Sequence, residues 1–91
     1  MSNSPAPTNY NWVGNTLTYD LDPSVDGVKI KYQKEGTIEW VEILNSPEAA
    51  PTSCSLNSSY GPKGTVCGVT KDTSGTGGGW GTEVCSPIEN V

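Results

Sequence analysis

Short stretches of alternating apolar and polar residues, separated by turn-forming residues, are the feature that most constrains the fold. In the clearest example Val28, Ile30 and Tyr32 alternate with Lys29 and Lys31. This period of two places the apolar side chains on one face of a strand and the lysines on the other. No segment shows the 3.6-residue apolar periodicity of an amphipathic helix. We therefore predict an all-β chain.

Turn signals divide the chain into strands of similar length. The 91 residues include 11 glycines and 7 prolines, while three tryptophans and four tyrosines distinguish the composition from that of a disordered chain. We expect seven short strands, at residues 10–13, 16–21, 28–33, 37–44, 52–56, 65–70 and 80–85. Seven such strands in one small domain predict an antiparallel β-sandwich. The expected divisions are an extended N-terminal arm, the sandwich and a C-terminal tail, at residues 1–8, 9–87 and 88–91.

Several functional classes are disfavoured by residues that the chain lacks. It has no histidine and no arginine, and its net charge is −5. A serine or cysteine nucleophile would lack its usual base, and a phosphate-binding surface would lack its commonest side chain. The glycine-rich segment at 75–79 lacks the Gly-Lys-Ser/Thr ending of a phosphate-binding loop. We expect no enzymatic activity, no cofactor, no bound metal and no nucleic-acid partner, and the absence of a long apolar run predicts no membrane insertion.

The order of residues resembles that of a fibronectin type III domain, within the broader immunoglobulin-like class. Gly27-Val-Lys-Ile-Lys-Tyr32 is similar to the family's glycine-led strand that ends in tyrosine. Further resemblances fall at residues 17–19, 39–42, 52–56, 65–70 and 79–84. Tyr19 stands where the family has tryptophan, and Tyr60 is the candidate for the tyrosine that anchors the corner before the sixth strand.

The three cysteines allow two alternatives, one with a disulfide and one with three reduced thiols. In a sandwich of this kind the sixth and last strands are adjacent, so Cys67 and Cys85 are candidates for a disulfide, which would leave Cys54 as a buried thiol or an intermolecular link. The alternative is three reduced thiols that pack as small apolar residues. Spacings of 13 and 18 residues do not resemble a zinc knuckle.

Aromatic residues and the glycine-rich loop are the candidate partner contacts. They are Tyr10, Trp12, Tyr60, Gly77, Gly78, Gly79 and Trp80. Trp12 and Trp80 are expected to be more exposed than Trp40, for which we expect core packing. On the opposite face of the sheet from the core, Lys29 and Lys31 are expected to pair with Glu39 and Glu42 across a hairpin.

Carboxylates gather around one predicted turn. Asp20, Asp22 and Asp26 lie within seven residues, but their spacing does not fit a calcium-binding loop. We interpret them as turn-forming residues.

A non-catalytic interaction module is the function that these features favour. The start of the chain lacks the basic and apolar segments of a signal peptide. Since fibronectin-like domains recur on phage surfaces, the resemblance implies a structural protein of the virion surface. It would be a capsid-decorating (cement) or tail-associated protein that binds capsid or other scaffold subunits and forms oligomers in the assembly. The alternative is a fibronectin-like spacer or a carbohydrate-binding or cell-adhesion module, extracellular or at the cell surface, with a glycan as partner.

Overall fold

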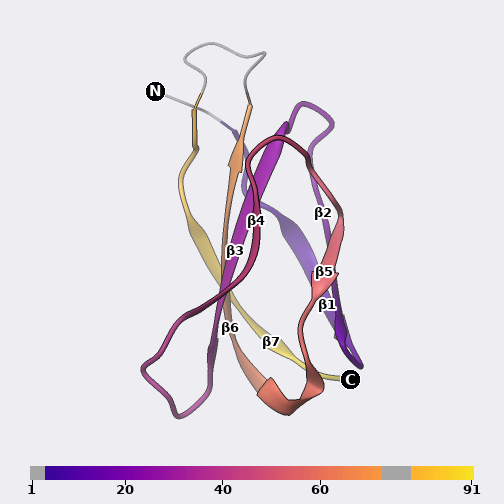
Figure 1. Cartoon of the computed structure of the whole chain (residues 1–91), viewed down its shortest axis with the longest axis vertical. Coiled ribbons are helices and arrows are strands. Elements are labelled where there is room, and N and C mark those ends of the chain that lie inside the picture. The colour runs from indigo at the N-terminus through magenta and orange to yellow at the C-terminus, as the bar shows by residue number, and fades with distance from the viewer. Residues whose placement is uncertain (1–3, 73–78) are drawn as a thin grey trace.

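A computed structural model describes residues 4–72 and 79–91. Two antiparallel sheets face each other, so the predicted all-β sandwich is confirmed (Figure 1). The strands are β1 (Thr8–Val13), β2 (Thr16–Asp20), β3 (Gly27–Lys34), β4 (Val41–Ser46), β5 (Ser53–Ser55), β6 (Lys63–Lys71) and β7 (Val84–Glu89), with one 3-10 turn, η1 (Ser58–Tyr60). In these ranges no helix has the length and apolar character required to cross a membrane.

The two sheets differ in size. The smaller has the strand order β1-β2-β5, and the larger has the order β4-β3-β6-β7. All pairings between neighbouring strands are antiparallel. The strands β3 and β6 form the centre of the larger sheet and pair over eight residues, from Gly27 opposite Lys71 to Lys34 opposite Gly64.

The core lies between the sheets and follows the alternation predicted for β3. Val28, Ile30 and Tyr32 are fully buried, while Lys29 and Lys31 lie on the outer face of the larger sheet. Buried side chains from both sheets and from the segment after β5 complete the core: Trp12, Leu17, Tyr19, Leu56, Val66 and Ile88. Because β3 pairs with both β4 and β6, its inward side chains have a neighbouring strand on each side within the sheet.

Two tryptophans occupy environments opposite to those expected. Trp12 is 1% exposed, its indole N–H donates to the Leu56 carbonyl at 2.9 Å, and its ring meets Tyr32 edge-on. Trp40 is 43% exposed. The expectation that Trp12 is more exposed than Trp40 is therefore wrong, and Trp12 offers almost no surface to a partner because its side chain is enclosed in the core. Trp40 is not a core residue, since it lies just before β4 with its ring beside Lys31 on the outer face of the larger sheet.

Two strands begin four residues later than predicted. The fourth starts at Val41 rather than at residue 37, and the segment before it forms a loop whose turn contains Gly36 at φ 86°. The seventh runs over Val84–Glu89 rather than 80–85 and includes Pro87. Proline is tolerated there because β7 lies at the edge of its sheet, where one side of the backbone needs no strand partner.

The first described residues and the last residues of the chain pack against the sandwich. The N-terminal residues 4–7 pack against the inner side of β6, where the Thr70 hydroxyl donates to the Pro5 carbonyl at 2.6 Å. Gly68 makes room for this segment, since a Cβ there would collide with the Tyr10 hydroxyl and Pro7. At the other end, the amide of Val91 donates to the Trp12 carbonyl. The C-terminus thus lies beside β1 (Figure 1). The described part of the arm thus covers its own domain.

Candidate functional site

The predicted contact residues do not form a single surface. Tyr10 and Tyr60 are half-buried, and their rings meet the core residues Tyr19 and Tyr32. Trp12 lies in the core, as described above. Gly79 is exposed and Trp80 is half-buried, while Gly77 and Gly78 lie outside the described residues.

Tyr60 organises the corner before β6 through its ring and backbone. Its carbonyl accepts a hydrogen bond from the Tyr32 hydroxyl at 2.6 Å, and the two rings meet edge-on at 5.9 Å. Among the described residues, the Tyr60 hydroxyl has no hydrogen bond that would anchor the corner in the manner of the fibronectin and immunoglobulin tyrosine. Tyr60 is therefore bound to the core on one side and is only partly available to a partner.

The outer face of the larger sheet carries lysines paired with tryptophans. The Trp80 ring lies 4.3 Å from the Lys29 ammonium and 5.7 Å from that of Lys71. Both distances are typical of cation–π contacts, and each such contact contributes about 0.5–1 kcal/mol at an exposed site. Lys31 lies 4.8 Å from the Trp40 ring.

The ion pairs on this face differ from those expected. Lys31 pairs with Glu83 at 3.5 Å, and Lys29 lies over Trp80. The expected pairs with Glu39 and Glu42 are absent from the described residues. Glu39 lies in the loop before β4, and Lys31, although it lies opposite Glu42 in the register, directs its ammonium to Glu83.

A disulfide joins Cys67 of β6 to Cys85 of β7, as in the first of the two alternatives. The two cysteines are directly opposite each other in the register, on the outer face beside Lys31. Cys67 is almost fully buried and Cys85 is exposed. Together with Glu83 these cysteines form a cluster of three potential metal ligands in the described residues, but the disulfide occupies both sulfur atoms.

Cys54 is a free thiol on β5 whose side chain faces the core from the smaller sheet. It lies opposite Leu17 in the register and packs against the core cluster. Burial raises the pKa of its thiol to about 11. Burial also raises the pKa of the neighbouring Tyr10 to about 12, with a smaller contribution from Cys54, and raises the pKa of Tyr19. The fold thus favours the neutral form of all three groups.

We expect the Cys54 thiol to be unreactive in the folded protein. With its pKa raised from 9.0 to about 11, the thiolate fraction at pH 8 falls roughly 100-fold. Alkylation by iodoacetamide should be slower by about that factor than in the same protein unfolded in urea. Equal rates in the two states would contradict the enclosed position.

The raised pKa values also predict an alkaline loss of stability. The unfolded chain ionises first as the pH rises, so it binds fewer protons than the folded protein between about pH 9 and 12. These groups should therefore leave the free energy of unfolding unchanged from pH 7 to 8 and lower it above pH 9. Urea titrations at pH 7, 8, 9 and 10 measure this, and a rise in stability above pH 9 would contradict it.

The Asp22 carboxylate forms a turn, as interpreted from the sequence. It accepts hydrogen bonds from the Ser24 amide at 2.9 Å and from the Ser24 hydroxyl at 2.7 Å. These bonds lower the pKa of Asp22. The local geometry accounts for this carboxylate without a bound cation.

The loop between β3 and β4 carries the most exposed of the large apolar side chains in the described residues. Ile38 is 91% exposed, and Trp40 follows two residues later. Thr37 closes the turn, since both its amide and its hydroxyl donate to the Lys34 carbonyl. The local hydrogen bonds therefore hold the base of the loop while Ile38 points away from the core.

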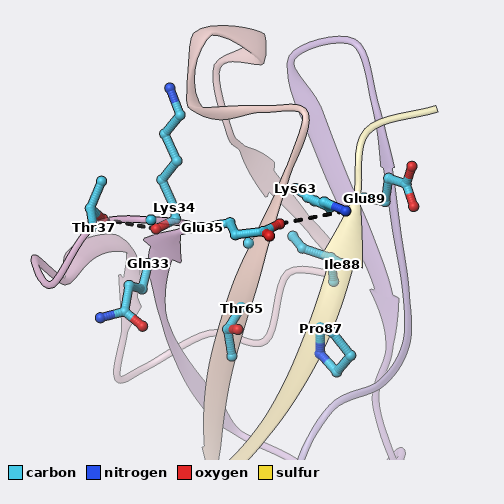
Figure 2. A pocket seen from close by; sticks show the side chains of 11 residues that line it. Gln33, Lys34, Glu35, Thr37, Lys63, Thr65, Pro87, Ile88 and Glu89 are labelled. Carbon is cyan, nitrogen blue, oxygen red and sulfur yellow. Dashed lines mark hydrogen bonds and ion pairs between the residues drawn. The ribbon is translucent and has the colours of Figure 1, made fainter.

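Two open hollows meet at this loop. Figure 2 shows the first, of about 600 Å³, where Gln33, Thr65 and Pro87 from three adjacent strands lie beside an ion pair between Glu35 and Lys63. The second, of about 490 Å³, is lined by Ile38, Val41 and Tyr60 among others. Both share Lys34, Gly36 and Thr37, so the loop stands between concave surfaces that a partner can fill.

The comparisons with protein-family models, with curated proteins and with solved structures found no match. The candidate site is therefore defined by its geometry alone. It consists of Ile38, Glu39 and Trp40 in the β3–β4 loop together with the adjoining edge of β4, and we call it the loop–edge site. Sequence reasoning missed it because Ile38 and Trp40 were placed inside a strand.

Proposed function

We propose that this chain is a non-catalytic protein-interaction module that binds its partner through the loop–edge site. The observation that carries the proposal is the exposure of Ile38 and Trp40, 91% and 43%, on one loop between two hollows. Tryptophan is among the residues that contribute most to protein–protein binding. An apolar side chain held in solvent by a hydrogen-bonded turn lowers the free energy of a complex that covers it.

The fold that we propose for the module is of the fibronectin type III kind. In constant-type immunoglobulin domains the fourth strand joins the sheet of the first, second and fifth. Here β4 instead pairs with β3, in the sheet that contains β6 and β7. This strand order supports the fibronectin-like assignment over the constant-type immunoglobulin one.

For its setting we propose the surface of a viral particle, where the module would bind capsid or other scaffold subunits. The alternative is an extracellular or cell-surface protein. The disulfide between Cys67 and Cys85 supports both settings, because disulfides persist outside the reducing cytosol. Quantitative mass spectrometry of purified particles from the source should find the chain in a fixed ratio to the major capsid subunit. Its absence from washed particles would favour the alternative.

Photo-cross-linking tests the proposed contact surface. A photoreactive residue at position 38 should capture one partner protein in the native source. The same residue at Val13, which is 55% exposed on β1, serves as the control and should capture much less. Capture of the same protein with equal yield at both positions would contradict the proposal.

We expect Trp40→Ala to weaken binding to the captured partner about 30-fold, since loss of a central tryptophan costs about 2 kcal/mol. Val13→Ala should change the dissociation constant less than about threefold, because it lies outside the loop–edge site. Isothermal titration calorimetry with the purified pair measures both values. An unchanged dissociation constant for Trp40→Ala would contradict the proposal.

Glycan binding is the second candidate. Trp40 and Trp80 both lie beside outward-facing lysines of β3, so two indole rings are present on one sheet face. Sugar rings stack on such aromatic surfaces. A glycan-array signal lost in Trp80→Ala, with the protein partner still bound, would favour this function, and no array signal for the wild type would remove it.

A further inference from the structure

We infer that the partner contributes an extended segment, with alternating basic and apolar residues, that adds to the larger sheet as a strand along β4. The inference rests on the proposed function and names the chemistry of the partner at the loop–edge site. Strand addition of this kind combines backbone hydrogen bonds with side-chain pockets on alternate residues.

The strand β4 has an unpaired edge. In the described residues it is the last strand of its sheet and its backbone pairs with β3 alone. The only described backbone bond between the smaller sheet and the segment that follows β4 joins the Tyr19 amide to the Thr52 carbonyl, beyond the end of β4. Alternate amide and carbonyl groups of Val41–Ser46 therefore point away from β3 and are available to a further strand.

The charge along this edge selects a basic occupant. Glu39, Glu42 and Glu48 are exposed in and beside β4. All five lysines of the chain lie in β3 or β6, so β4 has none. The lysine opposite Glu42 in the register, Lys31, pairs with Glu83 instead. A strand with lysine or arginine on its outward side would place cations beside carboxylates that have no ion pair in the described chain.

The same charges disfavour a second copy of this chain. Two β4 edges paired with each other would bring Glu42 and its neighbours close to identical carboxylates. Like charges on paired strands are destabilising, and edge charges are a common means of preventing self-association. The edge is thus suited to a different protein with complementary charge.

The inward side of the edge offers apolar contacts. Val41, Ile43 and Leu44 are only half-buried, and the last two pack against the core cluster. Residues of an added strand alternate between the two faces of the sheet. Apolar residues at every second position would cover Val41 and Leu44, while the intervening basic residues would lie on the face of Glu42 and Trp40.

A synthetic peptide tests the inference without knowledge of the natural partner. The probe is a capped nine-residue peptide of alternating arginine and valine, added to the ¹⁵N-labelled full chain. We expect saturable shifts of amide resonances in 39–46 and slower hydrogen exchange at alternate amides of β4. An acidic twin with glutamate in place of arginine should not bind.

Two variants separate strand addition from general attraction to an acidic protein. The double variant Glu39→Gln/Glu42→Gln should bind the arginine–valine peptide at least fivefold more weakly than the wild type does. Asp20→Asn, which removes an exposed carboxylate of β2 in the smaller sheet, is the matched control and should change binding less than twofold. A peptide with N-methyl groups on alternate residues keeps its charge but lacks the donors that a strand needs, so it should not bind.

The inference is overturned if the N-methylated peptide binds as well as the parent, if the amide shifts fall outside β4, or if the parent does not bind. Each of these results is independent of the cross-linking at position 38. Specific cross-linking together with no peptide binding would retain the loop contact and reject strand addition. Peptide binding along β4 together with equal cross-linking at positions 38 and 13 would reject the proposed loop contact instead.

Discussion

Replacing Trp12 with alanine is expected to lower the free energy of unfolding by about 3–5 kcal/mol. The side chain is 1% exposed, contacts Tyr32 edge-on and donates its indole N–H to the Leu56 carbonyl. Alanine would leave a cavity in the core and an unpaired carbonyl. Because small domains have a total stability of about 5–15 kcal/mol, this change removes a large part of it. Urea denaturation followed by far-UV circular dichroism measures the loss.

The matched control is Trp40→Ala, which removes the same side chain from an exposed position. It should cost less than about 1 kcal/mol, mainly the cation–π contact with Lys31. If Trp12→Ala does not fold, Trp12→Phe keeps much of the volume and loses the indole donor, and it should cost about 1–3 kcal/mol. Equal losses for the alanine variants at 12 and 40 would contradict the positions of both tryptophans.

Removing the Cys67–Cys85 disulfide is expected to lower the free energy of unfolding by about 3 kcal/mol. The two residues are 18 positions apart, and closing a loop of this length restricts the unfolded chain by about that amount. The effect should appear in the Cys67→Ala/Cys85→Ala double variant and, for the wild type, after reduction. The midpoint of urea denaturation measures it under both conditions.

Reductant provides an internal control for this experiment. It should not change the stability of the double variant, because Cys54 is then the remaining cysteine. The unreduced wild type should release one titratable thiol when unfolded, and the reduced protein should release three. Three thiols without reductant, or no loss of stability on reduction, would contradict the disulfide or its role.

The alternation of apolar and polar residues made the buried face of β3 predictable from the sequence. Val28, Ile30 and Tyr32 are buried and the intervening lysines are outside, as their spacing requires. The central position of β3 in its sheet explains this success, because both of its edges are paired and its register is fixed by neighbours on each side.

In the segment before β4, the alternation pattern did not determine which side chains face the core. Trp40 and Val41 are consecutive, so a strand without a bulge turns their side chains to opposite faces of the sheet. With Val41 and Leu44 turned to the core around a bulge, Trp40 remains outside. The sequence thus indicated that one of these two residues lies at the surface, and the structure shows that it is Trp40.

Other features depended on long-range contacts that local patterns do not contain. The indole N–H of the buried Trp12 is satisfied by the Leu56 carbonyl, 44 residues away in the sequence. Pro87 is compatible with β7 because that strand is an edge, a property of the whole sheet. The exposed position of Ile38 depends on the turn that Thr37 closes onto Lys34. The loop–edge site could therefore be located only once the sheets were assembled.

Hydrogen–deuterium exchange of the full chain, with and without the protein captured from position 38, tests the loop–edge site most directly. We predict slower exchange in residues 36–46 on binding, with the largest change in β4 and little change in β7. Unchanged exchange in 36–46, with protection confined to another part of the sandwich, would contradict the proposed contact surface.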